Sequence, residues 1–244
     1  MGYISDFHSH ILPNMDDGSG SVEESVALLE LEAAQGVERV VLTPHFYPLN
    51  ESPRDFLERR AVSVKTLLDA IKGRSDLPHL TVGAEVAYYL GMSQSEELPL
   101  LAIEGTDCIL IEMPPAPWPR YVWRDLRAIR EEWGLMPIIA HVDRYIRPLR
   151  TYGIPRRLEE IGVLVQANGN FFIRRETERM AMKLLKTGRV HLIGSDCHGM
   201  ETRRPNVKDA AEKIERKLGR EALFRIGELE EKIFNRMDWN GVIE

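Results

Sequence analysis

The chain alternates short runs of apolar, mostly β-branched residues with longer amphipathic stretches. Seven such runs predict strands near residues 3–7, 38–43, 80–84, 107–112, 137–141, 163–167 and 190–194. Several of these runs are apolar almost throughout, which is typical of strands buried on both faces of a parallel sheet. Because each run is followed by a helical pattern, the alternation predicts seven β–α units and an α/β fold.

Helix-capping signals separate the predicted strands. Residues 21–24 (SVEE) match a capping box and open a helix over residues 22–35. Ser52 is followed by Pro53, an N-cap residue with proline at the first helical position. Two closing helices are expected near residues 206–218 and 220–236. Since no low-complexity linker interrupts the chain, a single domain over residues 1–244 is predicted.

Composition and charge exclude several classes of protein. The net charge of −6 argues against a nucleic-acid surface, which needs a concentrated basic field. No apolar run reaches the roughly 20 residues needed to span a bilayer, and no secretory signal is visible at the N-terminus. Cys108 and Cys197 are too few for a disulfide framework, which favours a reducing cytoplasm. Oligomeric state is not indicated.

Each of the seven predicted strands ends in, or is closely followed by, a polar side chain of a metal-binding or amide type. These residues are His8, His10, His45, Glu85, Glu112, His141, Asn168, Asp196 and His198. The carboxyl ends of the strands of a closed α/β barrel form one face, and that face carries the active site. The two other histidines, His79 and His191, are interpreted as structural.

These side chains suit metal binding. His8 and His10 are two residues apart in an extended segment, so both point to the same side and can bind one ion. Mixed imidazole and carboxylate ligands suit zinc, manganese or iron rather than magnesium or calcium alone. The candidate ligands are His8, His10, Asp17, His45, Glu85, Glu112, His141, Asp196 and His198. Any one of them alone could be an ordinary hydrogen-bonded side chain, but so many converging ligands predict two or three metals.

Arginines accompany the candidate ligands. Arg144 follows the strand that ends at His141, and Arg203 or Arg204 follows His198. Guanidinium groups bind phosphate with paired hydrogen bonds, so these arginines indicate an anionic substrate. The alternative for each is a surface ion pair.

The motifs DFHSH, DDG, TPH, GAE, LIE, AHVDRY and SDCHGMETR occur in this order. This constellation resembles the PHP (polymerase and histidinol phosphatase) metallophosphoesterases. Its closest branch is the bacterial protein-tyrosine phosphatases of capsule and exopolysaccharide gene clusters. The resemblance extends from about Phe7 to Pro205.

The resemblance implies a distorted (β/α)₇ TIM-like barrel with three metals, most often manganese, with iron or zinc as alternatives. It assigns His8, His10, Glu85 and Asp196 to one metal, Glu85, Glu112 and His141 to a second, and Asp17, His45 and His198 to a third. Arg144 and Arg203 match the phosphate-binding arginines. The family usually has glutamate where this chain has Asp143.

The implied activity is hydrolysis of phosphotyrosine by a metal-bound hydroxide, with a bacterial tyrosine kinase of capsule or exopolysaccharide production as the protein substrate. One alternative is a histidinol-phosphate phosphatase or another small-molecule phosphoesterase of the same fold. A second alternative is a non-catalytic, metal-bound regulator that binds a phosphorylated protein.

Two further segments each have two possible interpretations. Residues 197–203 fit C-x₅-R, the pattern of phosphatases that use a cysteine thiolate, although Cys197 lies between two candidate ligands. In the loop over residues 113–123, Trp118 and Tyr121 either border the substrate site or pack against a helix.

Overall fold

The computed structural model describes residues 5–115, 117–146 and 153–236, and every strand pair in it is parallel. The strands are β1 (Ser5–Ser9), β2 (Arg39–Leu42), β3 (His45–Phe46), β4 (His79–Val82), β5 (Glu85–Ala87), β6 (Cys108–Glu112), β7 (Met136–Ile139), β8 (Leu164–Asn168) and β9 (Leu192–Gly194). The helices are α1 (Val22–Ala34), α2 (Pro53–Ala70), α3 (Arg120–Trp133), α4 (Ile154–Ile161), α5 (Gly169–Ile173), α6 (Arg175–Lys186), α7 (Val207–Leu218) and α8 (Arg220–Phe234). Short 3₁₀ turns cover Met92–Gln94 (η1), Leu98–Leu101 (η2) and Val142–Arg144 (η3).

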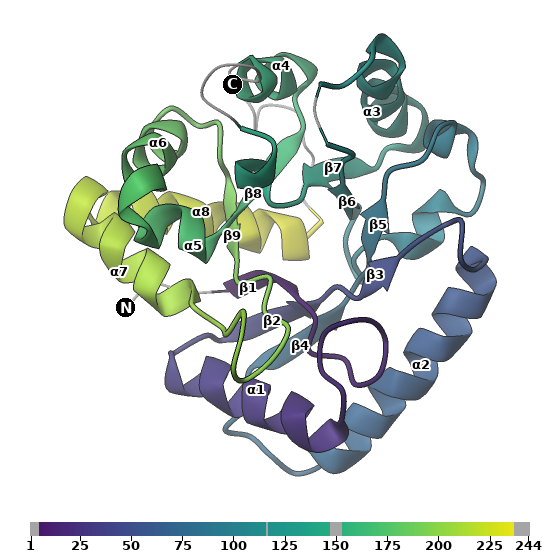
Figure 1. The fold of residues 1–244 in the computed structure, drawn as a ribbon, viewed down its shortest axis with the longest axis vertical. Helices are drawn as coiled ribbons and strands as arrows, with labels where there is room; N and C mark the ends of the chain where they lie inside the picture. The colour runs from purple at the N-terminus through teal and green to yellow at the C-terminus, as the bar shows by residue number, and fades with distance from the viewer. Residues whose placement is uncertain (1–4, 116, 147–152, 237–244) are drawn as a thin grey trace.

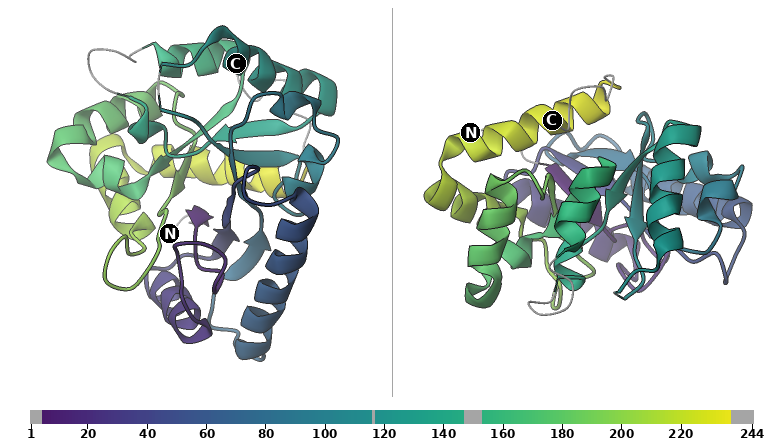
Figure 2. Two further views of the ribbon diagram at one scale, coloured as in Figure 1. Left: turned by 45° about the vertical axis from the view of Figure 1, so that its right-hand side comes forward. Right: turned by 90° about the horizontal axis from the view of Figure 1, so that it is seen from above.

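The strands curl into a distorted barrel with helices around its outside (Figures 1 and 2). One sheet has the order β1-β2-β4, and the other has the order β3-β5-β6-β7-β8-β9. The segment after β9 returns to β1: Asp196 N–H donates to the His8 carbonyl (2.7 Å), and His10 N–H donates to the Cys197 carbonyl (3.0 Å). The predicted distorted TIM-like barrel is thereby confirmed.

Two short strands are additional to the predicted ones. The run predicted over residues 38–43 forms β2 and the run predicted over 80–84 forms β4, and after a break each is followed by a further strand, β3 and β5. Pro44 stands at the first break, and it has no N–H to donate to a neighbouring strand. Gly83 stands at the second, where an added Cβ would lie 3.1 Å from the Ile103 side chain. His45 and Glu85 therefore begin new strand segments, which corrects the expectation that Glu85 ends a strand.

The barrel interior is apolar at one end and polar at the other. A buried cluster fills the amino-terminal end and includes Phe7, Val41, Leu110, Ile138, Leu164 and Leu192. Helix α8 crosses this end of the barrel (Figure 2), where Ile233 joins the cluster and Phe234 packs on Phe7 with ring centroids 5.3 Å apart. The carboxyl ends of the strands, on the opposite side, are left for polar residues.

The predicted helices are present with small differences at their ends. Ser21 caps α1 by accepting a hydrogen bond from Glu24 N–H, and Ser52 caps α2 in the same way from Asp55 N–H. Helix α5 and the 3₁₀ turns are additional to the predicted elements. His191 lies just before β9 rather than within it, and its Nδ1 accepts a hydrogen bond from Val165 N–H (3.0 Å). In the described ranges, none of the helices combines the length and apolar character that crossing a membrane requires.

Candidate metal centre

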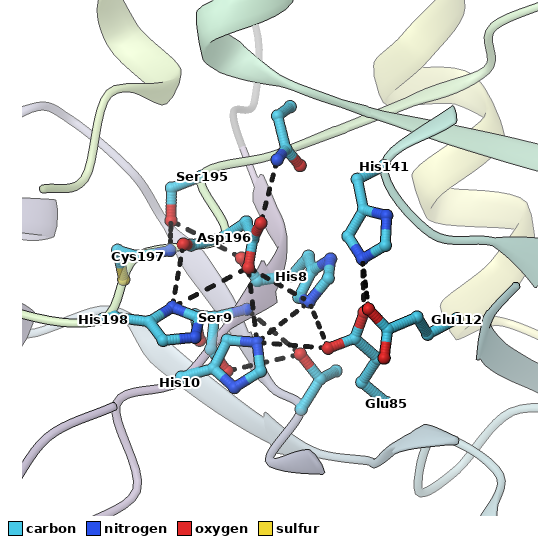
Figure 3. Close-up of polar contacts among 12 residues, drawn as sticks. His8, Ser9, His10, Glu85, Glu112, His141, Ser195, Asp196, Cys197 and His198 are labelled. Carbon is cyan, nitrogen blue, oxygen red and sulfur yellow. Dashed lines mark hydrogen bonds and ion pairs between the residues drawn. The ribbon is translucent and has the colours of Figure 1, made fainter. Parts of the chain in front are cut away.

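Glu85 lies at the centre of a histidine cluster inside the carboxyl end of the barrel (Figure 3). Its Oε1 lies 2.7 Å from His141 Nε2. Its Oε2 lies 2.9 Å from His45 Nδ1, 3.2 Å from His8 Nε2 and 3.4 Å from His10 Nε2. A single buried carboxylate thus joins side chains from β1, β3 and the end of β7.

Asp196 forms the other side of the cluster. Its Oδ1 lies 3.6 Å from His8 Nε2, 3.4 Å from His10 Nε2 and 3.7 Å from His198 Nδ1. Asn168, at the end of β8, donates from Nδ2 to the other carboxylate oxygen (2.9 Å). Asp196 has φ 54° and His141 has φ 31°, conformations that cost energy for residues other than glycine. Strained backbone of this kind is concentrated at functional sites.

A register shift in β1 points His8 into the cluster. The shift falls between Asp6 and Ser9 in the pairing with β2, as expected of a β-bulge. Asp6 therefore lies beside Glu32 of α1, outside the barrel, whereas His8 two residues later faces the interior. The Nε2 atoms of His8 and His10 lie 3.0 Å apart, so the two side chains point to the same place as predicted.

The two adjacent aspartates separate. Asp17 Oδ1 lies 3.4 Å from His198 Nε2 and 3.7 Å from His45 Nε2, although the side chain is 70% exposed. Asp16 turns inward, where its Oδ2 lies 2.8 Å from His10 Nδ1 and accepts from His45 N–H at 2.8 Å. The carboxylate selected by the family pattern, Asp17, is the one at the mouth of the cluster.

Glycine allows this loop to fold back on β1. A Cβ on Gly18 would lie 2.2 Å from the His10 carbonyl oxygen, which no other residue can accommodate. Gly18 N–H donates to Asp16 Oδ1 (2.9 Å), and Ser19 N–H donates to the His10 carbonyl (3.0 Å). In the DDG motif, the two aspartates supply carboxylates and the glycine is required because the backbone passes so close to His10.

Three side chains orient the imidazoles from behind. Besides Asp16, Gln166 Oε1 lies 3.3 Å from His8 Nδ1 and accepts from His141 N–H at 2.6 Å. Tyr145 Oη lies 3.2 Å from His141 Nδ1. Contacts of this kind fix which ring nitrogen faces a metal. Gln166 and Tyr145 were missed from the sequence, although Gln166 lies two residues before Asn168 and therefore on the same face of β8.

Glu112, at the end of β6, and Arg144, in η3, complete one edge of the cluster. Glu112 Oε1 lies 3.5 Å from His141 Nε2 and 3.3 Å from Arg144 Nη1. Arg144 Nη2 lies 2.6 Å from Asp196 Oδ2. Asp143, the departure from the family pattern, accepts from Asn168 N–H (3.0 Å) and so joins η3 to the end of β8.

Arg203 is the member of the Arg203–Arg204 pair that reaches the cluster. Its Nη2 lies 2.5 Å from Asp196 Oδ1, on the carboxylate that also binds Arg144. The side chains of Arg144 and Arg203 are each 39% exposed, so an anion from solvent can reach both. Arg204 is exposed at the surface.

The charged groups of the cluster shift one another's pKa values. Burial alone would raise the pKa of Glu85, but His8 and the surrounding histidines hold that pKa well below 4.5. Burial would lower the pKa of His10, yet Asp16, Asp196 and Glu85 raise it well above 6.5. His198 behaves differently: burial, His10 and Arg203 lower its pKa to about 4, leaving its ring neutral.

The donor set fits divalent metals. Glu85 Oε2, His45 Nδ1 and His198 Nε2 are buried and make no hydrogen bond within the described residues. Close nitrogen and oxygen atoms without hydrogen-bond geometry are expected where both point at a shared ion. Four groups of cluster residues have ligand atoms within 4.8 Å of one another: His10, Asp17, His45 and His198; His8, His10 and Asp196; His8, Glu85 and His141; and His45, Glu85 and Glu112. The first two overlap with the expected assignment, whereas Glu112 groups with His45 rather than with His141.

Comparison with known proteins identifies the family of this chain. A model of the family described as capsular polysaccharide synthesis, CpsB/CapC, matches residues 4–230. The chain belongs to the CpsB/CapC family. The resemblance to the capsule-cluster branch inferred from the motifs is thereby confirmed.

Several relatives of this CpsB/CapC chain are named as tyrosine-protein phosphatases. The tyrosine-protein phosphatase YwqE of Bacillus subtilis (strain 168) is 26% identical over 231 residues, covering 91% of this chain and 88% of the relative. One solved structure comes from a study of YwqE from B. subtilis and CpsB from Streptococcus pneumoniae, which are described as metal-dependent tyrosine phosphatases. It superposes on this chain with a TM-score of 0.81, at 23% identity and with 96% of both chains covered. A histidinol phosphate phosphatase from Lactococcus lactis shares the fold more distantly, with a TM-score of 0.53 at 15% identity, covering 90% of this chain and 93% of the other.

The C-x₅-R segment of this CpsB/CapC chain is not a thiolate site. Cys197 is fully buried beside Asp6 and Glu32, on the outside of the histidine cluster. Burial and these two acidic groups raise the pKa of the Cys197 thiol well above 9.0, so it stays protonated. Arg203 points to Asp196 rather than to the cysteine. The cysteine-phosphatase alternative is therefore wrong.

The aromatic loop packs rather than lining the site. Trp118 is only 7% exposed, and its Nε1 donates to the Pro114 carbonyl (2.8 Å). Its ring contacts Trp123 and Tyr145, with centroids 5.0 and 5.4 Å away. Tyr121 is exposed on the first turn of α3. Trp118 thus supports Tyr145, which in turn supports His141.

Proposed function

We propose that the protein is a metal-dependent protein-tyrosine phosphatase. Its proposed substrate is phosphotyrosine on a bacterial tyrosine kinase of capsule or exopolysaccharide production, in the cytoplasm. The observation that carries the proposal is the meeting of Arg144 and Arg203 on Asp196, at the edge of a buried histidine–carboxylate cluster. The names of the relatives, tyrosine-protein phosphatases of the same family, support the choice of substrate.

The proposed ligands are the nine candidate residues. His8, His10, Glu85 and Asp196 would hold one ion, Glu85, Glu112 and His141 a second, and Asp17, His45 and His198 a third. Manganese is the proposed metal, with iron or zinc as alternatives. Divalent ions in such a site lower the pKa of coordinated water and offset negative charge on a phosphoryl group.

The two arginines would bind the phosphate. Both guanidinium groups are positioned by the Asp196 carboxylate, and both are accessible from solvent. Paired N–H donors match the oxygens of a phosphoryl group and stabilise the charge that it carries during transfer.

A tyrosine leaving group needs little protonation by a general acid. A tyrosine phenolate has a pKa near 10, far below that of an alkoxide. Within the described cluster, the histidines and carboxylates already contact one another, and Asp16, Gln166 and Tyr145 hold the rings in place. We assign no general acid.

The decisive experiment measures turnover of a phosphotyrosine peptide together with metal content. The purified protein should hydrolyse the peptide, lose this activity with a chelator, and recover it when manganese is added back. Activity that survives complete metal removal, verified by elemental analysis, would rule out the proposal.

The same assay separates the alternatives. A small-molecule phosphoesterase would hydrolyse histidinol phosphate with a higher kcat/KM than the peptide. A non-catalytic regulator would retain metal and bind the phosphopeptide without turning over any aryl phosphate. The accessible arginines and the nine proposed ligands favour a catalytic phosphatase over a non-catalytic regulator.

A further inference from the structure

Tyr47 lies against His45 at the edge of the cluster. It directly follows β3, and its ring stacks on the imidazole of His45 with centroids 4.9 Å apart and ring planes 24° apart. The Tyr47 residue is nevertheless 39% exposed. Since His45 covers one face of the tyrosine ring, its other face and edge are available to a ligand.

Strand register places Tyr47 on the arginine side of the site. His45 pairs with Glu85 and Phe46 with Val86, so Tyr47 comes next to Ala87 at the end of β5. Ala87 in turn pairs with Glu112, whose carboxylate binds Arg144 (Figure 1 shows β3, β5 and β6 side by side). Glu112, Glu85 and Asp17 also add to burial in raising the pKa of the Tyr47 hydroxyl, which stays neutral.

Two other aromatic rings near the cluster are covered. Tyr145 is buried behind His141, and Trp118 is buried against Tyr145. Among the described residues, the exposed aromatic side chains besides Tyr47 are Tyr121 and Phe224, and neither makes a ring contact with a cluster histidine. Tyr88 and Tyr89, which follow β5, are half-buried, and the Tyr88 hydroxyl donates to Asp125. Of the two tyrosines whose rings contact a cluster histidine, Tyr47 and Tyr145, Tyr47 is the exposed one.

We propose that Tyr47 determines specificity for aryl phosphates: its open face packs against the phenyl ring of the substrate while Arg144 and Arg203 hold the phosphate. This inference rests on the proposed phosphatase function and extends it by naming the residue that recognises the aryl group. Offset-stacked aromatic pairs add about threefold to tenfold to binding beyond the contact area. An alkyl phosphate would gain nothing from such a stack.

Direct binding tests the proposal without turnover. Phenylphosphonate and methylphosphonate are titrated by calorimetry into metal-loaded wild type and into Tyr47→Ala, Tyr47→Phe and Phe224→Ala. Tyr47→Ala should weaken phenylphosphonate about threefold to tenfold and leave methylphosphonate unchanged. Tyr47→Phe should bind both as wild type does, because the ring and not the hydroxyl makes the contact. Phe224→Ala, a distant exposed aromatic on α8, serves as the matched control.

Two results would overturn the inference. Unchanged phenylphosphonate binding in Tyr47→Ala would show that the ring makes no contact with the aryl group. Equal weakening of both phosphonates, with or without loss of metal, would show that Tyr47 only supports His45. Failure of the proposed function is a separate result: wild type would not hydrolyse a phosphotyrosine peptide, whatever the two binding constants are.

Discussion

The Asp16 carboxylate lies 2.8 Å from His10 Nδ1, on the side of the imidazole that faces away from the cluster. The Nε2 of the same ring lies 3.4 Å from both Glu85 and Asp196. Asp16 therefore aims His10, whereas its neighbour Asp17 faces His45 and His198 directly. Two adjacent carboxylates have different tasks because the loop turns at Gly18.

Substituting Asp16 or Asp17 by asparagine should change metal binding in different ways. Asp17→Asn removes a proposed ligand, so it should reduce the metal bound per chain by about one ion. Asp16→Asn should keep the full metal count but weaken affinity about tenfold to a hundredfold, as expected when an orienting partner of a ligand is lost. Elemental analysis after gel filtration and chelator competition measure the two quantities. The reverse pattern would exchange the roles of the two aspartates.

Glu85→Ala should abolish turnover of a phosphotyrosine peptide. The carboxylate contacts four histidines, and its loss removes the ligand proposed to join two metals. Bound metal should fall in parallel, and circular dichroism should confirm that the barrel still folds. His8→Ala should behave in the same way. Retained metal-dependent activity in either variant would contradict the proposed ligand set.

Arg203 and Arg204 should differ sharply in their contribution to activity. Arg203→Ala should lower kcat/KM for a phosphotyrosine peptide about a hundredfold to a thousandfold, the usual effect of losing one donor to a transition-state anion. Arg144→Ala should have a similar effect. Arg204→Ala, with an exposed side chain next in sequence, should change kcat/KM less than about threefold and is the matched control. A larger loss in Arg204→Ala than in Arg203→Ala would reverse the assignment.

Cys197→Ala should leave turnover within about twofold of wild type, because the thiol is buried away from the cluster and remains protonated. Iodoacetamide should likewise fail to inactivate the folded protein. Loss of activity in the variant with its metals still bound would restore the cysteine as a nucleophile.

Glu230 should make stability depend on pH. Burial raises its pKa to about 8 in α8, and the nearby Ser5 and Arg39 offset this only in part. The native state therefore holds a proton that the unfolded state releases above a pKa of 4.5, so stability falls as pH rises from about 4.5 to about 8 and then levels off.

Replacing the Glu230 carboxyl group with an amide tests this dependence of stability on pH. Glu230→Gln should unfold at a higher urea concentration than wild type at pH 8.5, and the difference should shrink at pH 5. Comparing the two proteins at each pH cancels the contribution of the metal cluster. A difference in urea midpoint that is the same at both pH values would show that Glu230 does not titrate in this range.

Much of the fold followed from local patterns. Apolar runs and capping residues placed the parallel strands and most helices within a few residues, because buried strands and capped helices have strong local signals. The short strands β3 and β5, which begin after Pro44 and Gly83, lie beyond the predicted runs over residues 38–43 and 80–84. A break depends on which neighbour pairs with each segment, and no local pattern contains that information.

The strand topology allowed part of the candidate site to be predicted. The carboxyl ends of parallel strands meet on one face, so the residues at those ends had to be neighbours, and His8, Glu85 and Asp196 are. Gln166, Tyr145 and Tyr47 were not found, because their importance lies in which ring they touch. Trp118 is the reverse example: the sequence offered it as a residue bordering the substrate site, but its ring is buried against Tyr145.

By itself, the sequence determined the class of fold and predicted which side chains gather at the carboxyl ends of the strands, because the ends of parallel strands lie on one face. The choice of Asp17 over Asp16 came from the family pattern and stays a prediction. Only the tertiary structure decided that Arg203 rather than Arg204 meets Asp196, that Cys197 is buried beside Asp6 and Glu32, and that Tyr47 is exposed beside His45. The physical reason is distance: side-chain reach, burial and charge pairing depend on residues far apart in the chain, which meet only when the barrel closes.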